Sequence, residues 1–259
     1  MLKRDYPYYP PKLISRINNV LKSGNVNYWT GNEGVLFEKG FSKYIGNKYS
    51  IAVSNGSVAL EIALKSLNLK KNDQIIVTPR SFVISASCVI NLGLKPVFAD
   101  VDSNGNLNIK GIKNSYSSKV KAIIVVHLNG FPCDLDPIMD FAKQYKIKVI
   151  EDCSQAHGSK YKNKHVGSFG DVSTFSFFGN KTITTGEGGM ITTNNKNYYN
   201  YCLEYKDHGH QNNPKFPRGK DTHKIYGFNY RVSELVGALG VEQLKKLKKV
   251  ISGNRIRYD

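Results

Sequence analysis

Short apolar runs alternate with segments of helical periodicity along most of the chain, and this alternation restricts the possible folds more than any other feature. Six runs are predicted as strands: Ser50–Ser54, Gln74–Thr78, Pro96–Asp100, Val120–His127, Ile147–Asp152 and Val172–Phe177. Apolar residues recur at helical spacing in the segments 36–45, 58–67, 83–91, 134–145, 196–206 and 232–250. Strands separated by helices favour an α/β fold with a mostly parallel sheet that helices cover on both faces.

The chain divides at its last helical segment. Residues 1–231 are predicted to form an N-terminal arm and one large α/β domain, because 259 residues with 40% hydrophobic content supply a sizeable core. Residues 232–259 are predicted as a long helix that leads into a C-terminal domain, since the polar segment after Gly253 has neither a Gly cap nor a Pro stop. We therefore expect that the C-terminal domain is missing or truncated, with a frayed end of the chain as the alternative.

The composition favours a cytoplasmic protein. No run of 18 apolar residues is present, so no membrane span is predicted, and the N-terminus lacks the apolar core of a secretion signal. The four cysteines are far apart and form no CxxC pair, which is typical of a reduced compartment rather than of a disulfide framework or a zinc finger.

The chain carries a net charge of +17, from 37 Lys and Arg against 20 Asp and Glu. Such a charge is compatible with nucleic-acid binding. However, the basic residues are spread along the whole chain and form no stripe interleaved with aromatic residues. This favours a solvated, Lys-rich surface and a negatively charged small substrate, and we expect no nucleic-acid partner and no membrane partner.

Polar residues follow several of the predicted strands, at the edge where open α/β sheets bind ligands. Asn55, Gly56 and Ser57 stand at the start of a helix, where free N–H groups bind phosphate, although Ser57 is equally suited to cap that helix. Asp152 ends another strand, as a ligand-binding carboxylate or as a cap. Arg80, Ser81, Phe82 and His127 occupy corresponding positions after two further strands.

The segment Ser173–Met190 is the most specific stretch. It consists of a strand and a loop with a single lysine, Lys181, among threonines and glycines. A lysine in such a setting is suited to form an imine, although a surface lysine is the simpler alternative in a Lys-rich chain. The segment is not a phosphate-binding Walker loop, because Asn180 stands where that loop requires Gly.

These residues together fit pyridoxal 5′-phosphate. That cofactor needs an imine-forming lysine, a carboxylate for its ring nitrogen, a phosphate cradle and an aromatic side chain against its ring. Lys181 and Asp152 supply the first two. The cradle and the aromatic side chain are expected from Gly56, Ser57, Ser176 and Phe82.

The chain resembles the DegT/DnrJ/StrS family of pyridoxal-phosphate-dependent nucleotide-sugar aminotransferases, which have the aspartate aminotransferase fold, fold type I. The resemblance covers essentially the whole sequence. It rests on six ordered blocks: Trp29–Gly34, Ser54–Leu60, Val125–Gly130, Glu151–Gly158, Phe175–Met190 and Gly227–Glu234.

The resemblance implies a role for each candidate residue. Lys181 would hold the cofactor as an imine and carry the catalytic proton, and Asp152 would pair with the ring nitrogen. Gln155 would bind the phenolic oxygen, and Asn229 would reach the phosphate in the partner subunit's site, which implies a homodimer with shared active sites. His157 and Glu187 match the family's motifs without an assigned role.

The resemblance also implies the reaction. An amino acid, by family resemblance glutamate, would donate an amino group to a keto group of a nucleotide-linked deoxysugar, for polysaccharide or glycan biosynthesis. A branch of the family that removes a sugar 3-hydroxyl has His at the lysine position, so Lys181 favours transamination. The alternative is a non-catalytic or regulatory binder of the cofactor or of a nucleotide.

The loop after the segment 196–206 is rich in histidine. Asp207, His208, His210 and His223 do not have the spacing of a tetrahedral metal site, so no metal is expected. An anion-binding loop of Arg218, Lys220, His210 and Arg231, suited to a nucleotide-sugar diphosphate, is preferred to a metal site. A mobile surface loop is the equally open alternative.

Overall fold

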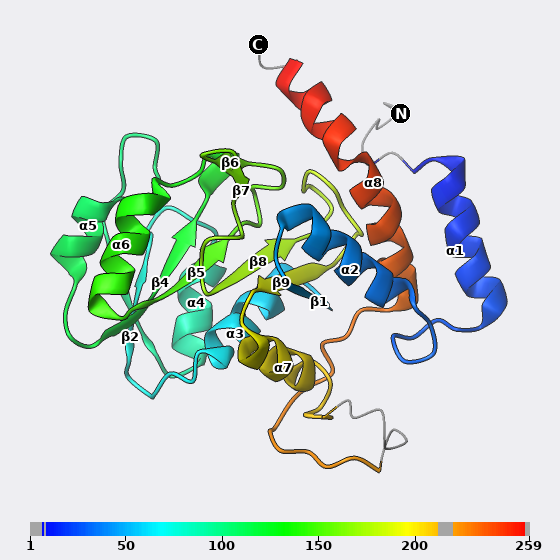
Figure 1. Ribbon diagram of the computed structural model, residues 1–259, viewed down its shortest axis with the longest axis horizontal. Coiled ribbons are helices and arrows are strands. Elements are labelled where there is room, and N and C mark those ends of the chain that lie inside the picture. Colours follow the sequence, from blue (N-terminus) through cyan, green and yellow to red (C-terminus); the bar gives the residue numbers. More distant parts are fainter. Residues whose placement is uncertain (1–6, 8, 212–219, 257–259) are drawn as a thin grey trace.

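The computed structural model describes residue 7, residues 9–211 and residues 220–256. Its centre is a seven-stranded sheet in the order β1 (Tyr49–Val53), β9 (Gly189–Thr193), β8 (Val172–Ser176), β5 (Lys148–Asp152), β4 (Val120–Val126), β2 (Gln74–Val77) and β3 (Lys95–Phe98). β9 runs antiparallel to both of its neighbours, and the other pairs of neighbours are parallel. The predicted mostly parallel sheet is therefore confirmed (Figure 1).

Helices cover both faces of this sheet, as predicted. One face packs against α2 (Glu33–Ile45), α5 (Ile109–Ser115), α6 (Leu135–Tyr145) and α8 (Glu234–Ile256). The other packs against α3 (Gly56–Ser66), α4 (Ile84–Asn91) and α7 (Lys196–Tyr205). Alternation along a strand divides its side chains between the two cores: in β2, Ile75 and Val77 face one core and Ile76 faces the other.

The last helix, α8, packs directly on α2. Gly237 makes this close crossing possible, because a Cβ atom there would lie 2.4 Å from the backbone nitrogen of Gly34. The carboxylate of Glu234 accepts hydrogen bonds from the N–H groups of Glu33 and Gly34, which satisfies the first turn of α2. The helix predicted at 232–250 is thus present, and it continues to Ile256.

Smaller elements complete the fold. α1 (Pro11–Ser23) lies beside α8, away from the sheet (Figure 1), and Arg16 joins it to Glu33 and Glu242. The short helix η1 (Leu128–Gly130) follows β4, and the hairpin β6 (Lys160–Tyr161) and β7 (Lys164–His165) follows β5. Among the described residues, no helix is long and apolar enough to span a bilayer.

Candidate active site

A cavity of about 490 Å³ opens at the carboxyl ends of β1, β2, β4, β5 and β8. This is the edge at which ligands bind in open α/β sheets. Seven of the eight residues predicted to bind a cofactor line it: Gly56, Ser57, Phe82, Asp152, Gln155, Ser176 and Lys181. Ser81 and Glu187 line it as well.

One wall of the cavity is the first turn of α3. Asn55 caps this helix, because its side-chain oxygen accepts a hydrogen bond of 2.9 Å from the N–H of Val58. The cap is therefore Asn55 and not Ser57, whose exposed side chain lines the cavity instead. A Cβ atom at Gly56 would lie 2.7 Å from the Cβ of Ser176, so glycine alone allows this helix end to approach β8. The wall combines helix N–H groups with the hydroxyls of Ser57 and Ser176, and both kinds of group can donate hydrogen bonds to a bound anion.

Asp152 lies at the end of β5 and is 6% exposed. Its Oδ1 accepts a hydrogen bond of 3.0 Å from the N–H of Ser154, which holds the carboxylate at the cavity. Gln155 is held in a similar way, since its Oε1 accepts a bond of 2.8 Å from the N–H of Asn129. Both side chains are thus oriented by the backbone before any ligand binds.

Lys181 is presented by the loop between β8 and β9. The loop is braced by its threonines: Thr184 Oγ1 donates to the carbonyl of Phe177 at 2.9 Å, and Thr185 Oγ1 donates to the carbonyl of Glu187 at 2.6 Å. The Gly- and Thr-rich sequence therefore builds a fixed support around one amine. Lys181 is half-buried and lines the cavity.

His157 lies close enough to Lys181 to sense its charge. Burial, and then the charge of Lys181, lower the pKa of His157 to about 3, so its imidazole is neutral. Its ring packs near the rings of Phe175 and Phe177, with centroids 5.7 and 5.4 Å away. His157 therefore faces the core beneath the site and not the cavity.

Phe82 stands at the rim of the cavity. Its side chain is 69% exposed, and the neighbouring Val83 is equally open. An aromatic ring at this position can cover a flat ligand in the cavity, as the sequence predicts.

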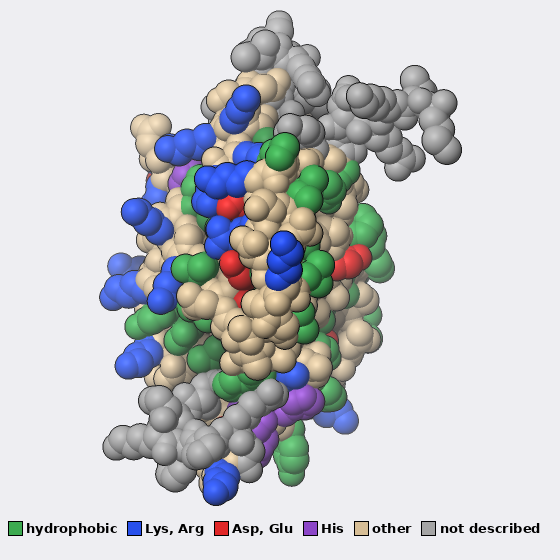
Figure 2. Space-filling model, turned by 90° about the vertical axis from the view of Figure 1, so that its right-hand side faces the viewer, with side chains coloured by type: hydrophobic (Ala, Val, Ile, Leu, Met, Phe, Trp, Pro, Cys, Tyr) green, Lys and Arg blue, Asp and Glu red, His purple; other side chains and the backbone are tan. Residues whose placement is uncertain are grey.

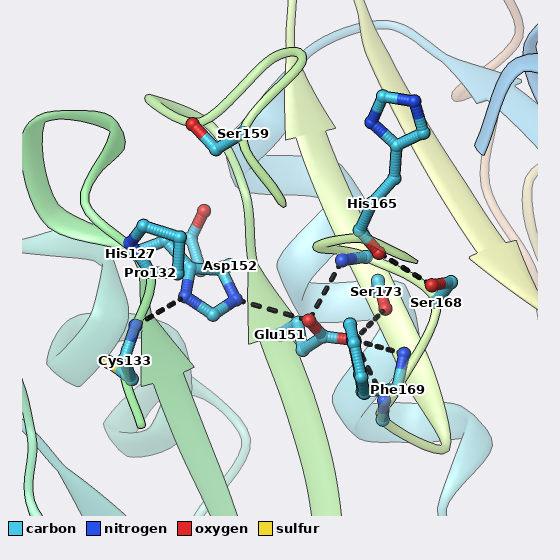
Figure 3. Close-up of polar contacts among 12 residues, drawn as sticks. His127, Pro132, Cys133, Glu151, Asp152, Ser159, His165, Ser168, Phe169 and Ser173 are labelled. Carbon is cyan, nitrogen blue, oxygen red and sulfur yellow. Dashed lines mark hydrogen bonds and ion pairs between the residues drawn. The ribbon is translucent and has the colours of Figure 1, made fainter. Parts of the chain in front are cut away.

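His127 was expected among the site residues, and this expectation is wrong. Its ring is fully buried and does not line the cavity: Nδ1 accepts a bond of 3.1 Å from the N–H of Cys133, and Nε2 lies 3.1 Å from Glu151 (Figure 3). Because Nδ1 accepts, Nε2 carries the proton and donates it to the carboxylate. Arg80 also lies outside the cavity lining, against Gly105.

Glu151 is a functional residue that sequence reasoning missed. It is fully buried, and it accepts bonds from the N–H groups of Gly167, Phe169 and Gly170 at 2.8, 2.8 and 2.7 Å and from Ser173 Oγ at 3.2 Å (Figure 3). Burial alone would raise the pKa of this carboxyl, but His127 and the backbone donors hold it below its ordinary value. The carboxylate thus fixes the strand end that carries Asp152.

The eighth predicted residue, Asn229, is exposed and does not line the cavity of its own chain. It forms an isolated antiparallel bridge with Asp207, whose carboxylate pairs with Arg231. Arg231 therefore already has an acidic partner within the chain. Arg218, the other arginine of the predicted anion-binding loop, lies outside the described residues.

Comparison with known proteins gives matches to a family model, to curated proteins and to solved structures. The model of the DegT/DnrJ/EryC1/StrS aminotransferase family matches residues 10–259. GDP-perosamine synthase of Escherichia coli O157:H7 is 39% identical over 253 residues, which are 96% of this chain and 68% of that protein.

Two solved structures are similar over most of the chain. The aminotransferase from Psychrobacter cryohalolentis has a TM-score of 0.90 and 42% identity, with 94% of this chain and 63% of that chain covered. E. coli GDP-4-keto-6-deoxy-D-mannose-3-dehydratase with bound hydrated PLP has a TM-score of 0.89 and 32% identity, with 95% and 68% covered. The chain therefore spans about two thirds of the length of these relatives.

Proposed function

The chain belongs to the DegT/DnrJ/EryC1/StrS aminotransferase family, and from this premise we propose that it is a pyridoxal-phosphate-dependent aminotransferase that acts on nucleotide-linked ketosugars. One observation carries the proposal: Lys181 and Asp152 line the same cavity. A pure binder needs a phosphate cradle, but it needs no amine in the same cavity as a buried carboxylate. This disfavours the non-catalytic or regulatory alternative.

The residues of the cavity fit the cofactor. The cradle between α3 and Ser176 has no room for a Cβ atom at Gly56, which leaves the helix N–H groups open to a phosphate. The Phe178 N–H approaches Ser176 Oγ at 3.4 Å, so the hydroxyl proton of Ser176 remains available to donate. Asp152 uses Oδ1 for Ser154, and its carboxylate borders the cavity.

When bound, pyridoxal phosphate supplies an aldehyde carbon that captures amines and a protonated ring that accepts electrons. Asp152 keeps the proton on the ring nitrogen, because its buried carboxylate favours a cation beside it. Lys181 Nζ would hold the cofactor at rest, and its amine would carry the proton that leaves the donor's Cα atom to the carbon that receives the amino group. Gln155 binds the phenolic oxygen, and Phe82 covers the ring and excludes water.

The substrate class rests on the relatives. Two of the three relatives are named for GDP-linked sugars. We propose a nucleotide-linked keto-deoxysugar as acceptor and glutamate as donor, in cytoplasmic biosynthesis of a polysaccharide or glycan. The +17 charge favours such an anionic substrate.

We propose that the enzyme is a homodimer in which Asn229 enters the partner's site. Asn229 is flanked by apolar side chains in the open: Tyr226 is 95% exposed and Phe228 is 52% exposed. Apolar groups this exposed mark contact surfaces. Neither lines the cavity of its own chain, which is consistent with a contribution to a second one.

The dehydratase relative supports a second candidate function, removal of a sugar hydroxyl. In that branch of the family the lysine position is His, by the resemblance stated above. Lys181 distinguishes this chain and favours transfer of an amine.

The test is covalent trapping of the cofactor. The purified chain is mixed with pyridoxal phosphate, its visible spectrum is recorded, and borohydride is added before peptide mapping. We expect a visible band that glutamate bleaches, and reduced cofactor on Lys181. Lys181→Ala should lose both, and Lys95→Ala, a change of an exposed lysine in β3, should lose neither.

Product analysis then separates the two reactions. A GDP- or UDP-linked 4-ketosugar with glutamate should yield an aminosugar and 2-oxoglutarate. A deoxygenated sugar without a new amine would overturn the proposed transamination, and trapping on a lysine other than Lys181 would overturn the site.

A further inference from the structure

The loop that follows α7 brings together three side chains that are distant in the sequence. His210 and His223 form an isolated antiparallel bridge, and Asp221 joins them. One potential ligand atom from each of the three lies within 4.8 Å of the other two. The sequence spacing argued against a metal here, because it did not show that residue 223 returns to residue 210. In Figure 2, histidine side chains lie together near the lower end of the molecule.

We propose that His210, Asp221 and His223 bind a zinc ion. His210 Nδ1 lies 2.9 Å from Asp221 Oδ1, and two ligands of tetrahedral zinc with bonds of about 2.0–2.1 Å are about 3.3 Å apart. The two imidazole rings lie with their centroids 4.2 Å apart, so small rotations bring the three ligands to one point. Two histidines with one carboxylate are a donor set that zinc accepts, with a fourth position left for water.

The surroundings orient one ligand in advance. His223 Nδ1 lies 2.8 Å from the carbonyl of His208. A carbonyl accepts only, so Nδ1 carries the proton and Nε2 keeps its lone pair for a metal. This arrangement is the usual outer partner of a metal-binding histidine.

The backbone around the cluster is fixed as well. The N–H of His210 bonds to the carbonyl of Asp207 at 2.9 Å, and the N–H of His208 bonds to the carbonyl of Phe228 at 3.0 Å. Just before them, buried Lys206 pairs with Glu38 at 2.8 Å. The ligands therefore stand on a braced turn, and a metal would tie together the two ends of the segment 211–220.

A second set of three potential ligands, His127, Glu151 and Cys153, does not compete as a metal site. All three are fully buried, and the Glu151 carboxylate already accepts from its backbone and side-chain donors. The cluster at His210 differs because His223 is exposed, which gives an ion access from solvent.

The test is zinc binding by the chain without cofactor. Protein treated with a chelator and dialysed is titrated with zinc chloride against a chromophoric zinc indicator, and retained zinc is counted by mass spectrometry. We expect one zinc per chain, at least tenfold weaker binding in His223→Ala and in Asp221→Asn, and a rise in the melting temperature with zinc in the unchanged chain only.

The matched control is His208→Asn. It removes a histidine of the same turn, keeps the carbonyl that orients His223, and suits the positive φ of 56° at this position. We expect it to bind zinc as the unchanged chain does. No zinc retained by the unchanged chain, or equal binding in His223→Ala and Asp221→Asn, would overturn the proposal. Circular dichroism of both variants excludes misfolding as the cause of lost binding.

Discussion

At the scale of single residues, the burial of His157 makes the free energy of unfolding depend on pH. Both of its ring nitrogens are buried, without a hydrogen-bond partner among the described residues, and its pKa falls to about 3 through burial and then through the charge of Lys181. Between this value and the ordinary value of 6.5, the unfolded chain binds a proton that the folded chain does not. The free energy of unfolding must then increase with pH across this window.

We expect this contribution to be complete above pH 6.5 and to be lost as the pH falls. Each unit is worth about 1.4 kcal/mol, so the loss from pH 6.5 to pH 5 should be about 2 kcal/mol. His157→Leu gives up no hydrogen bond, so urea unfolding at the two pH values should show that much less pH dependence in the variant. Equal slopes in the unchanged chain and His157→Leu would contradict the assignment.

The residue scale also shows what the sequence could predict of the site. Asp152 and Gly56 were found because parallel strands end at one edge, which follows from alternating strands and helices. His127 was misplaced and Glu151 was overlooked for one reason. Successive side chains at a strand end point to opposite faces of the sheet. Which of the two faces carries the cavity depends on where the strand lies in the sheet, and the sequence of the strand does not show this.

At the scale of elements, Glu151 joins β5 to β4, to β8 and to the loop 165–170. Its oxygens serve three backbone N–H groups and the Ser173 hydroxyl, besides His127. Glu151→Gln would turn an NH₂ group toward some of these donors and leave buried groups unpaired. We expect a loss of about 2–4 kcal/mol in the free energy of unfolding.

Urea unfolding at pH 7.5 measures this loss, and hydrogen exchange at Gly167, Phe169 and Gly170 should quicken. Asp140→Asn, which removes a carboxylate from the exposed side of α6, is the control and should stay within about 0.5 kcal/mol of the unchanged chain. A Glu151→Gln protein as stable as the control would show that the network is dispensable.

Elements with regular periodicity were predicted nearly to their ends. Several others were not: the short elements α5, η1, β6 and β7, and also β9 and α1. β9 begins with glycines that indicate a loop, and it is a strand because Met190 and Ile191 pair with both β1 and β8. α1 begins at Pro11 and is stabilised through contacts with α8, more than 200 residues away. Pairings of such separation are set by the tertiary fold and not by local sequence.

At the scale of the whole molecule, the basic surface and the proposed dimer need different explanations. Lys and Arg side chains lie mostly on the left and upper parts of the face in Figure 2, mixed with neutral side chains and a few acidic ones. The proposed dimer is instead supported by the exposure of two aromatic side chains, Tyr226 and Phe228, next to Asn229.

A shared site makes a prediction that no single-chain site makes. Lys181→Ala removes the attachment point in its own site, while Asn229→Ala would weaken phosphate binding in the partner's site. In a hybrid dimer of the two variants, one site carries both changes and the other carries neither. Random mixing makes half of the dimers hybrid, so about a quarter of all sites should be intact.

The two variants are unfolded and refolded together, and cofactor is trapped with borohydride at a pyridoxal phosphate concentration too low for either variant alone. We expect trapping to return to about a quarter of the level of the unchanged chain, and only on chains that carry Asn229→Ala, because only they keep Lys181. Trapping that stays at the sum of the separate variants would mean that Asn229 serves its own chain or no site at all. Since cofactor attachment is read here without turnover, the outcome tests how the sites are shared independently of the sugar that they accept.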